Sequence, residues 1–71
     1  MKLRRLAIIG VGLIGGSLAR ALRRGEHVGE IVGCGRAREN LETAVSLGVI
    51  DRYTHDISEA VEGADMVFLA V

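Results

Sequence analysis

The 71-residue sequence has no proline, no tryptophan, a single cysteine and only two aromatic residues. A lone thiol cannot form an internal disulfide, so Cys34 favours a reducing, cytoplasmic location. Nine basic and nine acidic side chains cancel, and a neutral chain has no broad field to attract nucleic acid or an anionic membrane. No apolar run approaches the roughly 20 residues that a membrane helix needs. We therefore expect neither nucleic acid nor a membrane as a partner.

Glycine, in contrast, supplies ten residues, roughly twice its usual share of about 7%. With 71 residues the chain is about half of an average domain of roughly 100–150 residues, which is too short for a complete two-domain enzyme. The final segment, Ala64–Val71, is strongly apolar. Proteins normally cover a strand of this kind, so we expect residues 1–71 to be the front part of a longer protein.

Short apolar runs alternate with segments of helical periodicity along the whole chain. We expect strands at 6–9, 30–34, 49–53 and 64–71. We expect a first helix from 13 or 14 to 24, a second at 38–47, and a short helical turn at 56–62. This alternation predicts an α/β fold in which crossover helices connect the strands of a parallel sheet.

A glycine-rich motif, Gly10-Val11-Gly12-Leu13-Ile14-Gly15, follows the first expected strand and opens the first expected helix. Gly10 permits a tight turn, Gly12 lets the backbone approach a pyrophosphate, and Gly15 allows close packing of helix on strand. Free N–H groups at the helix N-terminus would hold the phosphates. This context predicts a Rossmann-type domain with strand order 3-2-1-4 and a dinucleotide on all six residues. The alternative is a glycine-rich turn without a ligand.

The end of the second expected strand bears on the choice between NAD and NADP. Enzymes that use NAD usually carry an acid there, about 20 residues after the last glycine of the motif. In this sequence the position is Gly35, with Arg36 and Arg38 close behind. A guanidinium is the natural partner of a 2′-phosphate, so we favour NADP over NAD and expect these three residues to contact it. Alternatively, Arg36 stacks on the adenine, which both cofactors share, or is solvated.

The other polar candidates have simpler interpretations. We expect Cys34 to be a small residue of the sheet or beside the cofactor. We expect His27 and His55 to be solvated loop residues. The acidic residues lack the convergent spacing of a Mg²⁺ or Ca²⁺ site, so no metal is expected.

Three segments carry a more specific signal: Ile8–Ala19, in which Gly15-Gly16 precedes Ser-Leu-Ala, then Ala44–Asp51 and Ala64–Val71. Together they resemble the prephenate and arogenate dehydrogenases of tyrosine biosynthesis. The likeness extends over nearly all of the chain. It implies oxidative decarboxylation of prephenate or arogenate, a small-molecule substrate, with hydride transfer to NAD(P). It also implies that Ala70 and Val71 approach the cofactor from the fourth strand.

The resemblance also implies what lies outside these 71 residues. The family's catalytic histidine matches neither His27 nor His55 and lies beyond Val71, so we expect no catalytic residue here and no activity of this chain alone. The rest of the Rossmann domain and a helical domain that forms the homodimer lie beyond it as well. Many members carry an acid at the position of Gly35, and this departure argues against strict use of NAD. Two alternatives remain: another dehydrogenase of the 6-phosphogluconate type, or a non-catalytic module that senses NAD(P).

Overall fold

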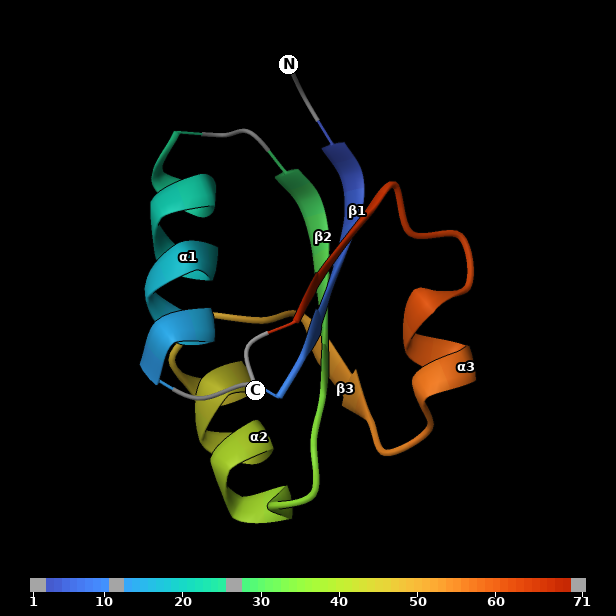
Figure 1. The fold of residues 1–71 in the computed structure, drawn as a ribbon. Coiled ribbons are helices and arrows are strands. Elements are labelled where there is room, and N and C mark those ends of the chain that lie inside the picture. Colours follow the sequence, from blue (N-terminus) through green and yellow to red (C-terminus); the bar gives the residue numbers. More distant parts are fainter. Residues whose placement is uncertain (1–2, 11–12, 26–27, 70–71) are drawn as a thin grey trace.

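The computed structural model describes residues 3–10, 13–25 and 28–69, with the backbone alone for 13–18. The elements follow one another as β1 (Leu3–Ile9), α1 (Leu13–Arg24), β2 (Val28–Cys34), α2 (Arg38–Ser46), β3 (Arg52–Thr54), α3 (Ile57–Val61) and β4 (Met66–Leu69). All strand pairs are parallel, and the sheet order is β3-β2-β1-β4 (Figure 1). The predicted Rossmann-type fold and its strand order are therefore confirmed.

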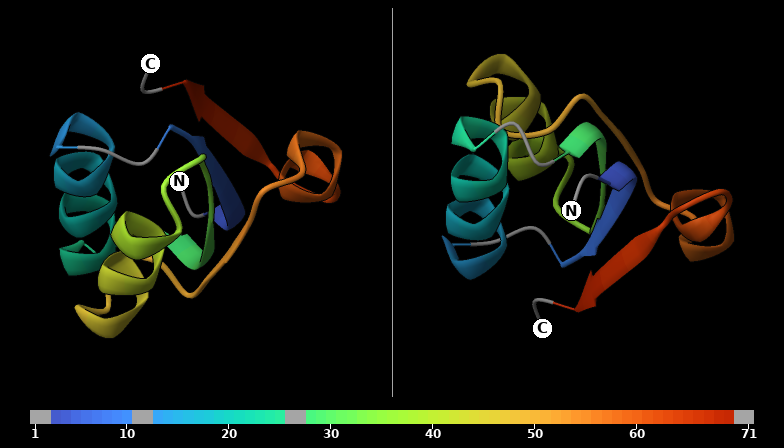
Figure 2. Two further views of the ribbon diagram at one scale, coloured as in Figure 1. Left: turned by 90° about the horizontal axis from the view of Figure 1, so that it is seen from below. Right: turned by 90° about the horizontal axis from the view of Figure 1, so that it is seen from above.

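Helices cover both faces of the sheet, as Figures 1 and 2 show: α1 and α2 lie on one face and α3 on the other. The larger core cluster lies between the sheet and the helices α1 and α2, and its fully buried members include Leu6, Ile8, Ile31 and Leu41. The smaller cluster lies beneath α3 and consists of Val32, Cys34 and Ala60. The central strands β1 and β2 are therefore buried on both faces, which explains why their sequences are continuous apolar runs rather than alternating ones.

The third strand is displaced from its expected position. The sequence predicts a strand at 49–53, whereas β3 covers Arg52–Thr54. Val49 and Ile50 are buried, but their N–H groups donate to the Ala44 carbonyl at the end of α2, at 2.9 and 3.3 Å. Their apolar side chains thus belong to the core while their backbone completes a helix end. Apolarity alone does not distinguish these two uses.

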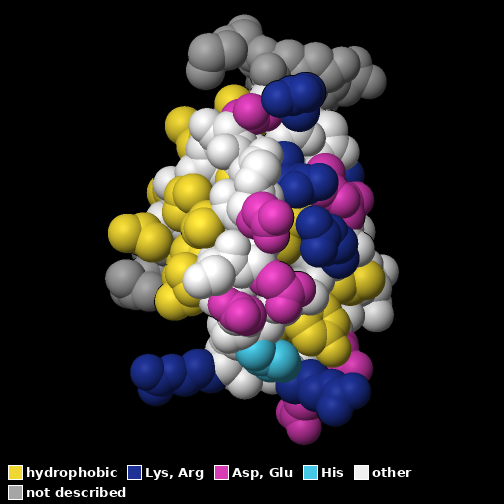
Figure 3. All heavy atoms as spheres, turned by 90° about the vertical axis from the view of Figure 1, so that its right-hand side faces the viewer, with side chains coloured by type: hydrophobic (Ala, Val, Ile, Leu, Met, Phe, Trp, Pro, Cys, Tyr) yellow, Lys and Arg dark blue, Asp and Glu magenta, His cyan; other side chains and the backbone are white. Residues whose placement is uncertain are grey.

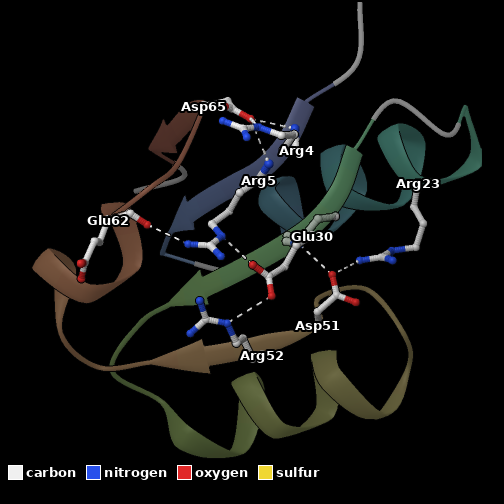
Figure 4. A network of polar contacts seen from close by, with 9 residues as sticks. Arg4, Arg5, Arg23, Glu30, Asp51, Arg52, Glu62 and Asp65 are labelled. Carbon is white, nitrogen blue, oxygen red and sulfur yellow. Dashed lines mark hydrogen bonds and ion pairs between the residues drawn. The ribbon is translucent and has the colours of Figure 1, made fainter.

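An aspartate precedes each of the strands β3 and β4 and joins it to its neighbour (Figure 4). The Asp51 N–H donates to the Ile31 carbonyl at 2.8 Å, and its carboxylate accepts the Ile31 N–H at 2.7 Å. The Asp65 N–H donates to the Arg5 carbonyl, and its carboxylate accepts the N–H groups of Arg4 and Arg5 at 2.8 and 3.2 Å. Each aspartate thereby fixes the register at which its strand enters the sheet.

A row of charged side chains crosses β1, β2 and β3 (Figure 4). The Glu30 carboxylate accepts from Arg5 Nε at 2.6 Å and from Arg52 Nε at 3.4 Å. Nη1 of the same Arg5 guanidinium donates to the Glu62 carbonyl at the end of α3, at 3.0 Å. Arg5 and Glu30 therefore extend the pairing of β1 and β2 beyond the apolar run on which the expected strand 6–9 was based.

We expect Asp51→Asn to make the chain less sensitive to acid. Burial favours the neutral acid, but the Arg23 hydrogen bond, the Ile31 N–H and the Arg23 charge outweigh it and lower the pKa of Asp51. A carboxyl with a lowered pKa in the folded state stabilises the fold above its unfolded pKa, and this contribution disappears as the pH falls through the folded pKa. Because Arg23 and Asp51 are partly exposed, we expect Asp51→Asn to cost about 1 kcal/mol at neutral pH.

Urea unfolding measured across the acid range tests this expectation. The wild-type chain should lose more free energy of unfolding than Asp51→Asn between about pH 5 and pH 2. Glu59→Gln is the control, because Glu59 is exposed and has no hydrogen bond or ion pair with a side chain that the structure describes. Parallel pH profiles for the wild type and Asp51→Asn would contradict the assignment.

Candidate functional site

The carboxyl ends of the four strands lie level with one another. Ile9 pairs with Cys34 and with Leu69, and Cys34 pairs with Thr54. The residues that follow β1, β2 and β3 therefore meet at one edge of the sheet: Gly10, Gly35 and His55. The connections between β1, β2 and β3 run over one face, whereas α3 carries the chain to β4 over the other (Figure 1). The order thus reverses between β1 and β4, which is where open α/β sheets bind ligands.

The turn after β1 has the geometry that a glycine-rich phosphate loop requires. Gly10 has a φ of 82°, in the left-handed region that favours glycine, and its N–H donates to the Cys34 carbonyl at 2.6 Å. The helix α1 then begins at Leu13, so the first N–H groups of the helix, including those of Ile14 and Gly15, have no partner within it. The predicted contacts Val11 and Gly12, like Ala70 and Val71 after β4, lie outside the described residues.

The turn after β2 presents basic side chains. Gly35 is half-buried and Arg36 is exposed, and Arg36 forms no ion pair with any residue that the structure describes. Arg38 is the first residue of α2, and its Nε lies 3.7 Å from the Glu42 carboxylate. Arg38 therefore has an acidic partner among the described residues, whereas Arg36 has none. A Cβ at Gly35 would meet the Leu41 side chain at 3.7 Å, which is an ordinary contact. The described residues therefore leave room for a Cβ at this position.

Cys34 is a core residue at the end of β2. Its side chain is buried beneath α3, and burial raises the pKa of the thiol, with the Asp56 charge adding to the rise. A thiol in such surroundings stays protonated at neutral pH and is a poor nucleophile. The structure thus places Cys34 in the sheet, which is one of the two positions expected for it.

His55 lies at the same sheet edge, in the turn that follows β3. Its Nδ1 is 2.8 Å from the Gly35 carbonyl, and its ring meets the Tyr53 ring edge-on at 5.7 Å. The ring is exposed, as predicted, but it is also hydrogen-bonded to the candidate site. The sequence signal was present, because His55 directly follows a strand, but the expected strand ended at Tyr53. His27 lies outside the described residues.

A protein-family model described as NADP oxidoreductase, coenzyme F420-dependent, matches residues 5–71. The chain belongs to this family. The match extends from β1 through the last described strand and includes the glycine-rich turn and the turn after β2. The chain is thus a Rossmann domain, or a part of one, of the NAD(P) oxidoreductase type.

Solved structures with the same fold are dehydrogenases. The prephenate dehydrogenase from A. aeolicus, in complex with hydroxyphenyl propionate and NAD+, is 37% identical, with a TM-score of 0.87 over 97% of this chain. Synechocystis arogenate dehydrogenase is 35% identical, with a TM-score of 0.79 over 92%. A second structure of the Aquifex aeolicus prephenate dehydrogenase is 42% identical, with a TM-score of 0.78 over 92%. The resemblance predicted from the sequence is confirmed.

The likeness covers 92–97% of this chain, but this chain corresponds to only a small part of each matched enzyme. The chain spans only 22–24% of the length of the three matched chains. In the described part of the chain, no helix has the length and apolar character needed to cross a membrane.

Proposed function

We propose that this chain is the first part of the dinucleotide-binding domain of a prephenate or arogenate dehydrogenase. The observation that carries the proposal is the level edge at which Gly10, the start of α1 and the turn after β2 meet, beside the reversal of strand order. The likeness to prephenate and arogenate dehydrogenases over 92–97% of the chain supports the reaction class. In such a reaction, hydride passes from the substrate to the nicotinamide, and carbon dioxide leaves. The cytoplasm, as expected from the single cysteine, is the proposed location.

We propose that each turn at the carboxyl edge of the sheet contacts a different group of the dinucleotide. The pyrophosphate would lie over residues 10–15, where the N–H groups at the start of α1 and its dipole favour negative charge. Arg36, and secondarily Arg38, would contact the adenosine 2′-phosphate, so NADP is the favoured cofactor and NAD the alternative. Ala70 and Val71 would approach from the end of β4. Among the described residues at the carboxyl edge, the His55 ring is engaged with the Gly35 carbonyl and the Asp56 carboxylate accepts the Ser58 N–H.

The exposed side of β4 supports the proposal that further structure completes this domain. Met66, Val67 and Leu69 are 46, 43 and 66% exposed on this strand, and hydrophobic side chains gather on the surface beside α3 in Figure 3. An apolar edge of this kind is normally paired or covered. We propose that residues beyond position 71 continue the sheet and supply the catalytic histidine and a helical dimerisation domain. Reading the coding sequence past codon 71 tests this directly.

We expect Gly10→Ala to weaken dinucleotide binding, and Gly48→Ala is its matched control. Both glycines have a positive φ, 82° at Gly10 and 74° at Gly48, so an added Cβ costs about 1–2 kcal/mol of stability at either site. Only Gly10 lies at the proposed phosphate loop. Titration of nicotinamide fluorescence should therefore show NADPH affinity at least about tenfold weaker for Gly10→Ala and unchanged for folded Gly48→Ala. Equal affinities in the two variants would contradict the site.

Activity is the test of the reaction itself. The protein translated from the complete coding sequence should oxidise prephenate or arogenate, with carbon dioxide release and reduction of NADP. The 71-residue chain should bind the dinucleotide without turnover. Dinucleotide binding without turnover by the complete protein would instead favour the sensing module.

A further inference from the structure

The turn that follows β2 is held from both sides by hydrogen bonds to two successive carbonyls. The Cys34 carbonyl accepts the N–H of Gly10, from the turn after β1, at 2.6 Å. The Gly35 carbonyl is 2.8 Å from Nδ1 of His55, from the turn after β3. A backbone carbonyl can only accept, so Nδ1 carries the proton in this contact. The path of the chain out of β2 is thus determined by its two neighbouring turns.

His55 is itself held in place. It directly follows Thr54, which pairs with Cys34 in the sheet, and the Tyr53 ring meets the imidazole edge-on at 5.7 Å and 73°. On its other side, the Asp56 N–H donates to the Thr54 hydroxyl at 3.1 Å, and the Asp56 carboxylate accepts the Ser58 N–H at 2.9 Å. The imidazole therefore projects from a turn that hydrogen bonds hold in place. Its own hydrogen bond can thus restrict the position of the Gly35 carbonyl.

These hydrogen bonds matter at Gly35 because a glycine does little by itself to fix the path of the backbone. Glycine has the greatest backbone freedom, and Gly35 has no side chain to pack against Leu41. Arg36 follows it immediately and forms no ion pair with the described residues that would direct its guanidinium. Backbone contacts at Gly35 thus fix the backbone from which the Arg36 side chain projects.

We propose that His55 is a positioning residue for a 2′-phosphorylated dinucleotide, because its hydrogen bond to the Gly35 carbonyl places Arg36 against the 2′-phosphate. The inference rests on the proposed NADP site. It predicts a selective effect: loss of the His55 contact weakens binding of NADPH but hardly that of NADH, whose 2′-hydroxyl does not need Arg36. A merely structural role would weaken both dinucleotides equally.

The test is fluorescence titration of the chain with NADPH and with NADH. Loss of one hydrogen bond predicts NADPH binding about 5–10-fold weaker in His55→Ala, with NADH binding changed less than about twofold. His55→Asn should restore NADPH affinity, because its amide N–H can donate from the place of Nδ1. His55→Phe, which keeps the ring beside Tyr53 without a donor, should behave as His55→Ala and replaces it if the alanine variant does not fold.

A double variant separates positioning from direct contact. If His55 acts through Arg36, adding His55→Ala to Arg36→Ala should cause no further loss of NADPH affinity. Additive losses, equal losses for both dinucleotides, or no loss in His55→Ala and His55→Phe would each overturn the inference while leaving the proposed function intact. Failure of the wild-type chain to bind either dinucleotide would instead overturn the proposed function, and this inference with it.

Discussion

Replacing Gly35 with Asp and Arg36 with Ile is expected to reverse cofactor preference from NADPH to NADH. Among the described residues, a Cβ at Gly35 meets the Leu41 side chain alone, at 3.7 Å, which is an ordinary contact. The new carboxylate would repel a 2′-phosphate and accept hydrogen bonds from the ribose hydroxyls of NADH, while Arg36→Ile removes the charged partner. Hydrogen bonds to charged groups contribute about 1.5–3 kcal/mol, so the ratio of the two affinities should shift by roughly 100-fold or more.

Parallel titrations with both dinucleotides measure this ratio. Arg38→Ala is a useful comparison, since Arg38 faces Glu42 at 3.7 Å and should contribute less than Arg36. A double variant with the wild-type ratio would show that the turn after β2 does not contact the ribose. If Arg38→Ala changes the ratio of the two affinities more than Arg36→Ile does, the 2′-phosphate contact belongs to Arg38, in the first turn of α2.

Leu41→Ala is expected to remove about half of the stability of the chain. Leu41 is 1% exposed and joins α2 to the larger core cluster. Truncating a buried leucine costs about 2–5 kcal/mol, because the site loses apolar contacts and retains a cavity. A 71-residue fold has a free energy of unfolding of only about 4–10 kcal/mol. The melting temperature should therefore fall by at least about 10 °C, measured by circular dichroism.

Leu47→Ala provides the same chemical change on the surface. Leu47 ends the same helix and is 65% exposed, so its truncation should alter stability by no more than about 0.5 kcal/mol. Comparable losses in the two variants would mean that Leu41 does not belong to the core as the structure places it.

Local sequence was sufficient for the order and type of the elements. The helix expected from 13 or 14 to 24 matches α1, which begins at the first of these two residues, and α2 covers Arg38–Ser46, one residue short of the expected end. Such elements were predictable because apolar periodicity and a terminating glycine act within a few residues. Gly10 was predictable for the same reason, since a left-handed turn between a strand and a helix depends on the backbone of one residue.

Contacts between distant segments were beyond such reasoning. The expected strand 6–9 began after the charges, whereas β1 begins at Leu3, because Arg5 pairs with Glu30 across the sheet. The expected strand 49–53 included Val49 and Ile50, whose backbone groups instead bond to the end of α2. The partner of Arg5 lies 25 residues away. The partner of Val49 and Ile50 is the nearby Ala44, but an apolar run has the same pattern whether its backbone bonds to a strand or to a helix end.

The sequence by itself determined the alternation of strands and helices, the glycine-rich turn after β1 and the absence of an acid after β2. Each of these depends on neighbouring residues and their intrinsic backbone preferences. Only the tertiary structure decided that the strands end level and that His55 meets Gly35 across 20 residues. Register and hydrogen bonds between strands depend on how the helices pack the sheet together, and that packing is a property of the whole fold.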